Sequence, residues 1–149
     1  MKYSEKISNK LNELLEKTYD AEKGYRLAAD KVENPAVKKF LNDKVQQRYN
    51  FGHELKNEIS EFGQLPDKGG SFKGDMHRIW MNLTSTLSNN DTERILEEVE
   101  RGEKASLEEY NEILKETTLP MSTENLLTKQ RDAIKAALET AKRFETAVA

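Results

Sequence analysis

The sequence predicts an all-α protein built as a bundle of four long helices, and three observations favour this fold. Apolar residues recur at alternating steps of three and four along most of the 149-residue chain, which is the period of an α-helix. No run of residues alternates with a period of two, as a half-buried strand would. Turn-forming residues divide the chain into segments of helical length, and such helices bury their apolar faces only against one another. We therefore expect a single domain over residues 1–149.

The first helix is expected at about residues 4–32, where the apolar positions form a heptad seam. Asn34 can cap the second helix, because its side chain accepts backbone N–H groups that lack a helical partner. Pro35 suits the first helical position, where a missing N–H costs nothing. This second helix is expected over residues 35–62 and ends near Gly63.

About 27 residues separate the second long helix from the third, and this connection contains an amphipathic stretch at 75–88 that predicts a short extra helix. The third long helix is expected over residues 91–116, where Asn90-x-x-Glu93 forms a capping-box pattern. The fourth is expected over residues 122–146.

Link lengths constrain the topology. The short links predict that the first two helices form one antiparallel pair and the last two another. The longer connection permits a crossover along the bundle, as in ferritin-like folds, and leaves the direction of the third helix relative to the second open. We expect Trp80, within this connection, to cover one side of the bundle.

Polar residues interrupt the apolar faces near the middle of the helices. Arg48 projects near the centre of the apolar arc of its helix, and Glu103 and Gln130 take corresponding positions on theirs, at 100° per residue. Glu22 lies on the flank of the first seam. Residues at the middle of antiparallel helices of matched length meet at one level. We expect one buried polar layer of six residues: Glu22, Tyr25, Arg48, Glu103, Tyr110 and Gln130.

Charge pairing within this layer follows from the cost of burial. An unpaired buried charge costs several kcal/mol, whereas Arg and a carboxylate form charge-assisted hydrogen bonds. We therefore pair Arg48 with Glu103 and expect Glu22 to be a second acceptor. Either this cluster only fixes the register of the helices, or it lines a small polar cavity or residual metal site, with Glu22, Glu100 and Glu103 as oxygen ligands.

Several motifs support a family resemblance: Asp20-x-x-x-Gly24-Tyr25, Gln47-Arg48-x-x-Phe51, His77-x-x-Trp80, Glu100-Arg101-Gly102-Glu103 and Tyr110-x-x-x-Leu114. In combination, over about residues 8–145, they resemble an uncharacterised bacterial family of four-helix bundles that is classed as ferritin-like. The resemblance implies a ferritin-like bundle and no established activity.

The motif of a ferritin-like di-iron centre is missing. Such centres use Glu-x-x-His on two helices, because that spacing brings a carboxylate and an imidazole to one metal pair. Here His53 is preceded at that spacing by Asn50, and His77 by Gly74. The fixed guanidinium of Arg48 would also repel a cation. We expect no metal and no other cofactor.

Composition excludes further classes of function. The chain has no cysteine and two histidines, and no serine lies in a Gly-x-Ser-x-Gly context or within a phosphate-binding loop. The net charge of -3 provides no general attraction to nucleic acid or anionic lipid. No stretch approaches the roughly 18 apolar residues of a membrane span. We expect a cytoplasmic protein without a nucleic-acid or membrane partner.

Three hypotheses of function remain. The first is a non-catalytic helical bundle, related to stress or to protein interaction, which binds a protein partner or forms a homo-oligomer. The second is a protein that binds a metal or small ligand through its central carboxylates. The third is a redox enzyme with a degenerate di-metal centre, and the missing histidines make it the weakest.

Overall fold

The computed structural model describes residues 3–66, 80, 91–115 and 118–148. Four long helices account for most of these residues: α1 (Tyr3–Lys31), α2 (Pro35–Glu61), α5 (Thr92–Leu114) and α6 (Met121–Val148). No strand occurs in these ranges, and each helix ends within two residues of its expected position. The all-α prediction is confirmed. The helix expected at 75–88 lies outside the described residues, except for Trp80, which is helical.

Side chains at the helix ends explain these boundaries. The Asn34 side chain accepts hydrogen bonds from two backbone N–H groups in the first turn of α2, at 3.0 and 3.1 Å. Gly63 follows α2 with φ at +73°, a left-handed conformation that favours glycine after a helix. At α5 the cap is Asp91, which accepts from the Arg94 N–H at 3.2 Å. The expected cap at Asn90 is therefore wrong by one residue; the Asp91 carboxylate also suits the positive end of the helix dipole.

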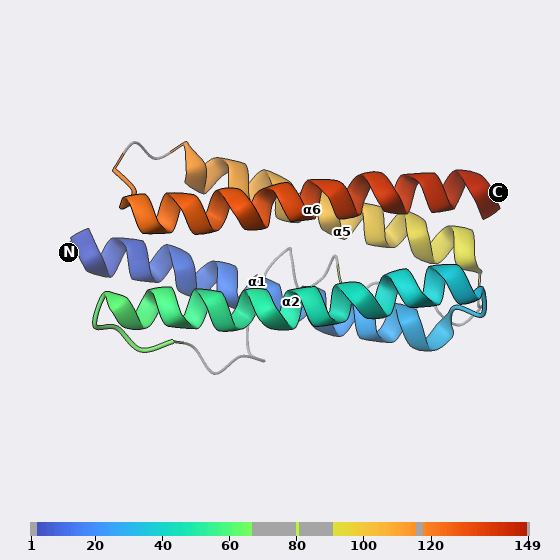
Figure 1. Cartoon of the computed structure of the whole chain (residues 1–149), viewed down its shortest axis with the longest axis horizontal. Helices are drawn as coiled ribbons and strands as arrows, with labels where there is room; N and C mark the ends of the chain where they lie inside the picture. The colour runs from blue at the N-terminus through green and yellow to red at the C-terminus, as the bar shows by residue number, and fades with distance from the viewer. Residues whose placement is uncertain (1–2, 67–79, 81–90, 116–117, 149) are drawn as a thin grey trace.

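The four helices form two antiparallel pairs, α1 with α2 and α5 with α6 (Figure 1). Helix α5 begins at the end of the bundle opposite to the end where α2 stops, so α2 and α5 run in the same direction (Figure 1). This arrangement settles the direction of α5 relative to α2, which the sequence left open.

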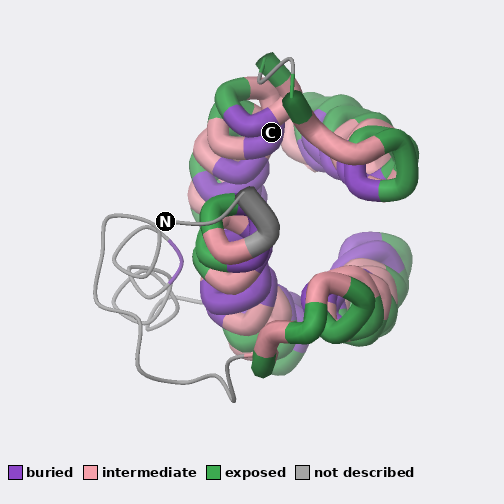
Figure 2. Tube along the Cα trace, turned by 90° about the vertical axis from the view of Figure 1, so that its left-hand side faces the viewer, coloured by how far each residue is buried: buried purple, intermediate pink, exposed green. Residues whose placement is uncertain are grey.

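The apolar core has two parts. One contains residues from the C-terminal half of α1, the start of α2 and the start of α5, together with Trp80. The other contains residues from the opposite ends of these helices and from the first half of α6. Exposed residues lie along the outside of the bundle when it is viewed from the end (Figure 2). The buried polar residues Arg48, Glu103 and Gln130 lie near the middle of their helices, between the two parts.

None of the helices in the described residues is both long and apolar enough to cross a membrane.

Candidate functional site

The centre of the bundle is occupied by an ion pair between Arg48 of α2 and Glu103 of α5. Their exposures are 2% and 0%, so both charges are withdrawn from water. An Arg48 Nη2–H donates to Glu103 Oε1, and Nη1–H donates to the Gln47 side chain at 3.1 Å. The guanidinium carbon also lies 5.6 Å from the centre of the Tyr25 ring and 5.4 Å from that of Phe51. These aromatic faces favour a cation, so Arg48 is held on several sides.

Tyr25 of α1 donates the second hydrogen bond to the Glu103 carboxylate. Its hydroxyl donates to Glu103 Oε2 at 2.7 Å, so both oxygens of this carboxylate are engaged. Burial, followed by the charge of Glu103, raises the pKa of Tyr25 well above its usual value, which keeps the hydroxyl protonated as a donor. Burial acts to lower the pKa of Arg48, but the adjacent Glu103 raises it overall. Burial raises the pKa of Glu103, whereas Arg48 and the Tyr25 hydroxyl act to lower it. The layer therefore combines one cation and one neutral donor with a carboxylate whose ionised form both of them favour.

A second series of side-chain hydrogen bonds links α5, α6 and α2 at the level of the Arg48–Glu103 pair. The hydroxyl of Tyr110 on α5 donates to Gln130 Oε1 on α6 at 2.7 Å. Gln130 Nε2 then donates to Glu54 Oε1 at 3.2 Å and to the Phe51 carbonyl at 3.4 Å, both on α2. Glu54 was not predicted from the sequence. Its position beside Leu55, at the edge of the apolar arc, was the signal that it borders the core.

Glu22 does not take part in this layer, and its expected role as a second acceptor for Arg48 is wrong. Its side chain is 19% exposed and accepts from Arg26, one turn along the same helix, at 3.0 Å. Glu22 lies on the flank of the α1 seam, so it reaches the surface. Tyr25, three residues later, supplies the contact from α1 instead.

The carboxylates considered as metal ligands are also not brought together. Glu103 bonds Arg48 in the core and Glu22 bonds Arg26 at the surface. Glu100 interacts with Glu145 of α6. Within the described residues, the three carboxylates whose oxygens lie within 4.8 Å of one another are Glu93, Glu97 and Glu145. They lie near the start of α5 and the end of α6, away from the centre.

Trp80 packs against α1 and α5. It is buried, with 0% exposure, and its ring centre lies 5.1 Å from that of Tyr25. At Gly102 the Trp80 ring approaches so closely that a Cβ atom built on this residue would lie 2.6 Å from Cε2 and Cζ2. The Trp80 ring therefore packs directly on Gly102, which precedes Glu103 in α5. This packing agrees with the expectation that Trp80 covers a side of the bundle.

Comparison with known proteins identifies the family. A family model described as a domain of unknown function (DUF2383) matches residues 6–116. The chain belongs to the DUF2383 family. A search of curated proteins finds no match.

Among solved structures, this DUF2383 protein is similar to a mutant of Mycobacterium smegmatis Dps1, with a TM-score of 0.77 and 12% sequence identity. The match covers 97% of this chain and 99% of the other. At that identity the likeness shows the fold, and the prediction of a ferritin-like bundle of unknown function is confirmed.

The centre of the DUF2383 protein does not fit a ferritin-type di-iron group. Such a group needs a carboxylate from each of two helices and Glu-x-x-His from each of two others. Of the described residues at this level, Glu103 has both oxygens engaged and Glu54 accepts from Gln130. The Arg48 guanidinium already provides the positive charge that the Glu103 carboxylate requires.

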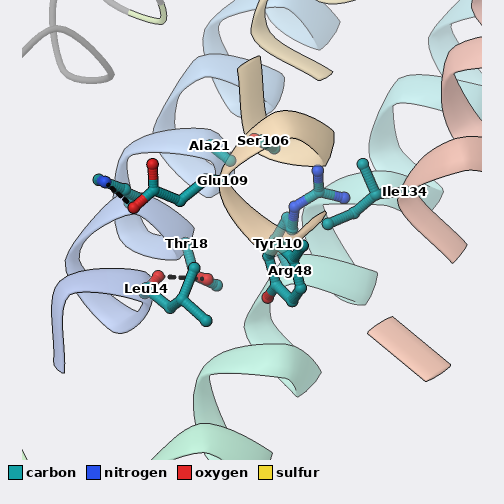
Figure 3. Close-up of a pocket in the computed structure, with 9 residues that line it drawn as sticks. Leu14, Thr18, Ala21, Arg48, Ser106, Glu109, Tyr110 and Ile134 are labelled. Carbon is teal, nitrogen blue, oxygen red and sulfur yellow. Dashed lines mark hydrogen bonds and ion pairs between the residues drawn. The ribbon is translucent and has the colours of Figure 1, made fainter. Parts of the chain in front are cut away.

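A small cavity remains beside Arg48 in the DUF2383 bundle, with a volume of about 10 Å³. Figure 3 shows Thr18 of α1, Arg48 and Tyr110 around it. Lys17 and Glu109, which also line it, form an ion pair at 2.6 Å. This volume is about that of one water molecule, so the cavity is too small for an organic ligand.

Glu100 predicts a pH dependence of stability. Burial, and then the contact with Glu145, raise its pKa from 4.5 to about 7, with Glu97 adding to the rise and Lys142 opposing it. The folded state therefore binds more protons than the unfolded state between these values, so its stability falls as the pH rises from about 4.5 to 7. We expect Glu100→Gln to stabilise the protein at pH 8, by at most about 1 kcal/mol because the site is partly solvated. At pH 4 it should have little effect.

Urea denaturation at the two pH values measures this difference. Glu108→Gln is the matched control, because Glu108 is an exposed glutamate on the same helix. An equal effect of Glu100→Gln at both pH values would contradict the predicted proton uptake.

Proposed function

We propose that this protein is a non-catalytic ferritin-like bundle that acts in stress physiology or protein interaction through its surface. In this proposal the Arg48–Glu103 layer replaces a di-iron site and fixes the register of the helices. No nucleic acid, membrane lipid or cofactor takes part.

The observation that carries the proposal is the engagement of Glu103. Its two oxygens accept from Arg48 and Tyr25, and its side chain has 0% exposure. A metal ion that entered at this level would have to displace both donors and approach a buried guanidinium. The energetic cost of that approach favours a structural role for the layer.

The alternative, a metal or small ligand bound by the central carboxylates, has less support. Glu22, Glu100 and Glu103 point to different partners. The cavity beside Arg48 has room for about one water molecule. Among the described residues, these two features support neither a ligand set nor a binding volume at the centre.

Elemental analysis of the desalted protein tests the proposal. We expect iron, manganese and zinc far below one ion per chain, both after expression without added metal and after incubation with iron(II). One or more retained ions per chain would overturn it. Glu103→Gln and Glu145→Gln then locate such ions, because the first variant removes a central carboxylate and the second removes a carboxylate of the peripheral group.

A further inference from the structure

A groove lies between the C-terminal end of α2 and the N-terminal end of α6, which meet at the same end of the bundle (Figure 1). Its volume is about 640 Å³, far larger than the central cavity. Phe62 and Leu126 supply apolar surface to its lining. Both side chains are partly buried and pack against the adjoining part of the core. The groove therefore has a fixed apolar floor.

Three carboxylates of α2 give this groove a negative charge. Glu54, Glu58 and Glu61 line it and share one face of the helix, because they are spaced at i, i+4 and i+7. Glu54 accepts from Gln130, and Glu58 accepts from the hydroxyls of Ser122 and Thr123 at 2.8 and 2.7 Å. These donors are neutral.

No Lys or Arg in the described part of the chain forms an ion pair with Glu54, Glu58 or Glu61. Glu61 is exposed. Within the described residues, these three carboxylates therefore have no cationic partner.

The same end of the bundle also exposes large apolar side chains. Leu65, just beyond α2, is 87% exposed, and Met121, at the start of α6, is 79% exposed. Among the described residues, Tyr49 is the other large apolar side chain with high exposure. An apolar surface next to unneutralised carboxylates is typical of a site that binds another protein.

We propose that this groove docks a basic amphipathic helix of a partner protein. Apolar side chains of that helix contact Phe62 and Leu126, and its Lys or Arg side chains pair with the carboxylates of α2. The carboxylates lie about 6 Å and about 4.5 Å apart along the axis of α2, so they face successive turns of a second helix. This inference names the partner class of the proposed function and rests on its claim that the protein acts through its surface.

The spacing of the carboxylates separates this partner from a bound metal ion. The oxygens of Glu54, Glu58 and Glu61 do not converge as those of Glu93, Glu97 and Glu145 do. A row of separated charges beside an apolar floor matches an extended ligand that is cationic on one side and apolar on the other.

A labelled synthetic peptide tests the proposal. The probe is a helical peptide with leucines on one face and lysines on the other, and the control peptide has the same composition in scrambled order. Fluorescence anisotropy measures the Kd of each for the full chain. We expect the amphipathic peptide to bind at least about tenfold more tightly than the scrambled peptide, because only the former presents both faces together.

Charge reversal locates the binding site. Glu61→Lys should weaken binding of the amphipathic peptide about tenfold. Glu139→Lys, the matched control, reverses an exposed glutamate of α6 about 20 Å along the helix axis from Leu126, and it should change the Kd less than twofold. Because the chain has no cysteine, a single cysteine in Asn57→Cys or Glu139→Cys allows a cross-link to the peptide at one site. We expect the cross-link at the first position alone.

Several outcomes would overturn the proposal. Equal binding of both peptides would show that the apolar floor takes no part, and equal effects of the two charge reversals would show that only the net charge attracts the peptide. Self-association that Glu61→Lys abolishes would assign the groove to a second copy of this chain. Each of these results leaves the metal content unchanged, so failure of this inference is distinguishable from failure of the proposed function.

Discussion

Arg48→Ala is expected to lower the free energy of unfolding by about 3–5 kcal/mol, because Glu103 stays buried without its cationic partner. Tyr25 would be the remaining donor to a carboxylate of 0% exposure. For a chain of this length, such a loss corresponds to a fall in Tm of roughly 10 °C. Urea denaturation followed by circular dichroism measures the change.

Two further sets of variants separate the loss of the charge pair from the loss of packing. Arg48→Met with Glu103→Leu should recover much of the stability, because a buried ion pair is replaceable by apolar residues. It leaves the Tyr25 hydroxyl without its acceptor, so adding Tyr25→Phe should recover about 1 kcal/mol more. Arg26→Ala is the surface control. Arg26 is 59% exposed in its contact with Glu22, and we expect a loss below about 1 kcal/mol.

A negligible effect of Arg48→Ala would place this side chain in water, and the polar layer described above would then be wrong. A large loss in the single variant without recovery in the multiple variants would instead indicate that the shape of the guanidinium, rather than its charge, holds the helices together.

Gly102→Ala is expected to destabilise the protein, although alanine is usually the better helix former. At a permissive helical site this change stabilises by about 1 kcal/mol. At Gly102 the new Cβ would lie 2.6 Å from the ring of the buried Trp80, so either the ring or the backbone must move. Overpacking of this kind costs about 1–3 kcal/mol. The emission of Trp80, the single tryptophan of the chain, should shift to the red if the ring is displaced toward water.

Gly52→Ala is the matched control, because Gly52 is also within a long helix and its Cβ would meet Tyr19 and Leu15 at 3.8 and 3.9 Å. These are ordinary contacts, so this variant should be stabilised by about 0.5–1 kcal/mol. The two substitutions should thus have opposite signs. In Trp80→Ala the additional change at Gly102 should no longer destabilise, because the clash is gone. Equal stabilisation by both glycine variants, with unchanged emission, would show that Trp80 is not seated on Gly102.

In the polar layer, some contacts could be predicted from the sequence and others could not. The apolar period of each helix places Arg48 and Glu103 on inward faces, and the cost of burying charge pairs them, as the structure does. The period of apolar residues predicts contacts less well for a residue at the edge of an apolar face. Tyr25 lies on the seam of α1 and Glu22 lies on its flank, three residues away, and the structure shows that Tyr25 reaches Glu103. The heptad pattern therefore places Tyr25 inward, but whether a residue on the flank also reaches the layer depends on the packing of α1 against α5.

The helices, their ends to within two residues and the polar interruption at their centre are predictable from the amino-acid pattern alone, because they depend on the local period of apolar residues and on caps. Three features depend on how the helices pack: the direction of α5, the contact of Trp80 with Gly102 and the contact of Glu100 with Glu145. Each of these joins residues that are far apart in the chain, and the pattern within one helix contains no information about which neighbour faces it.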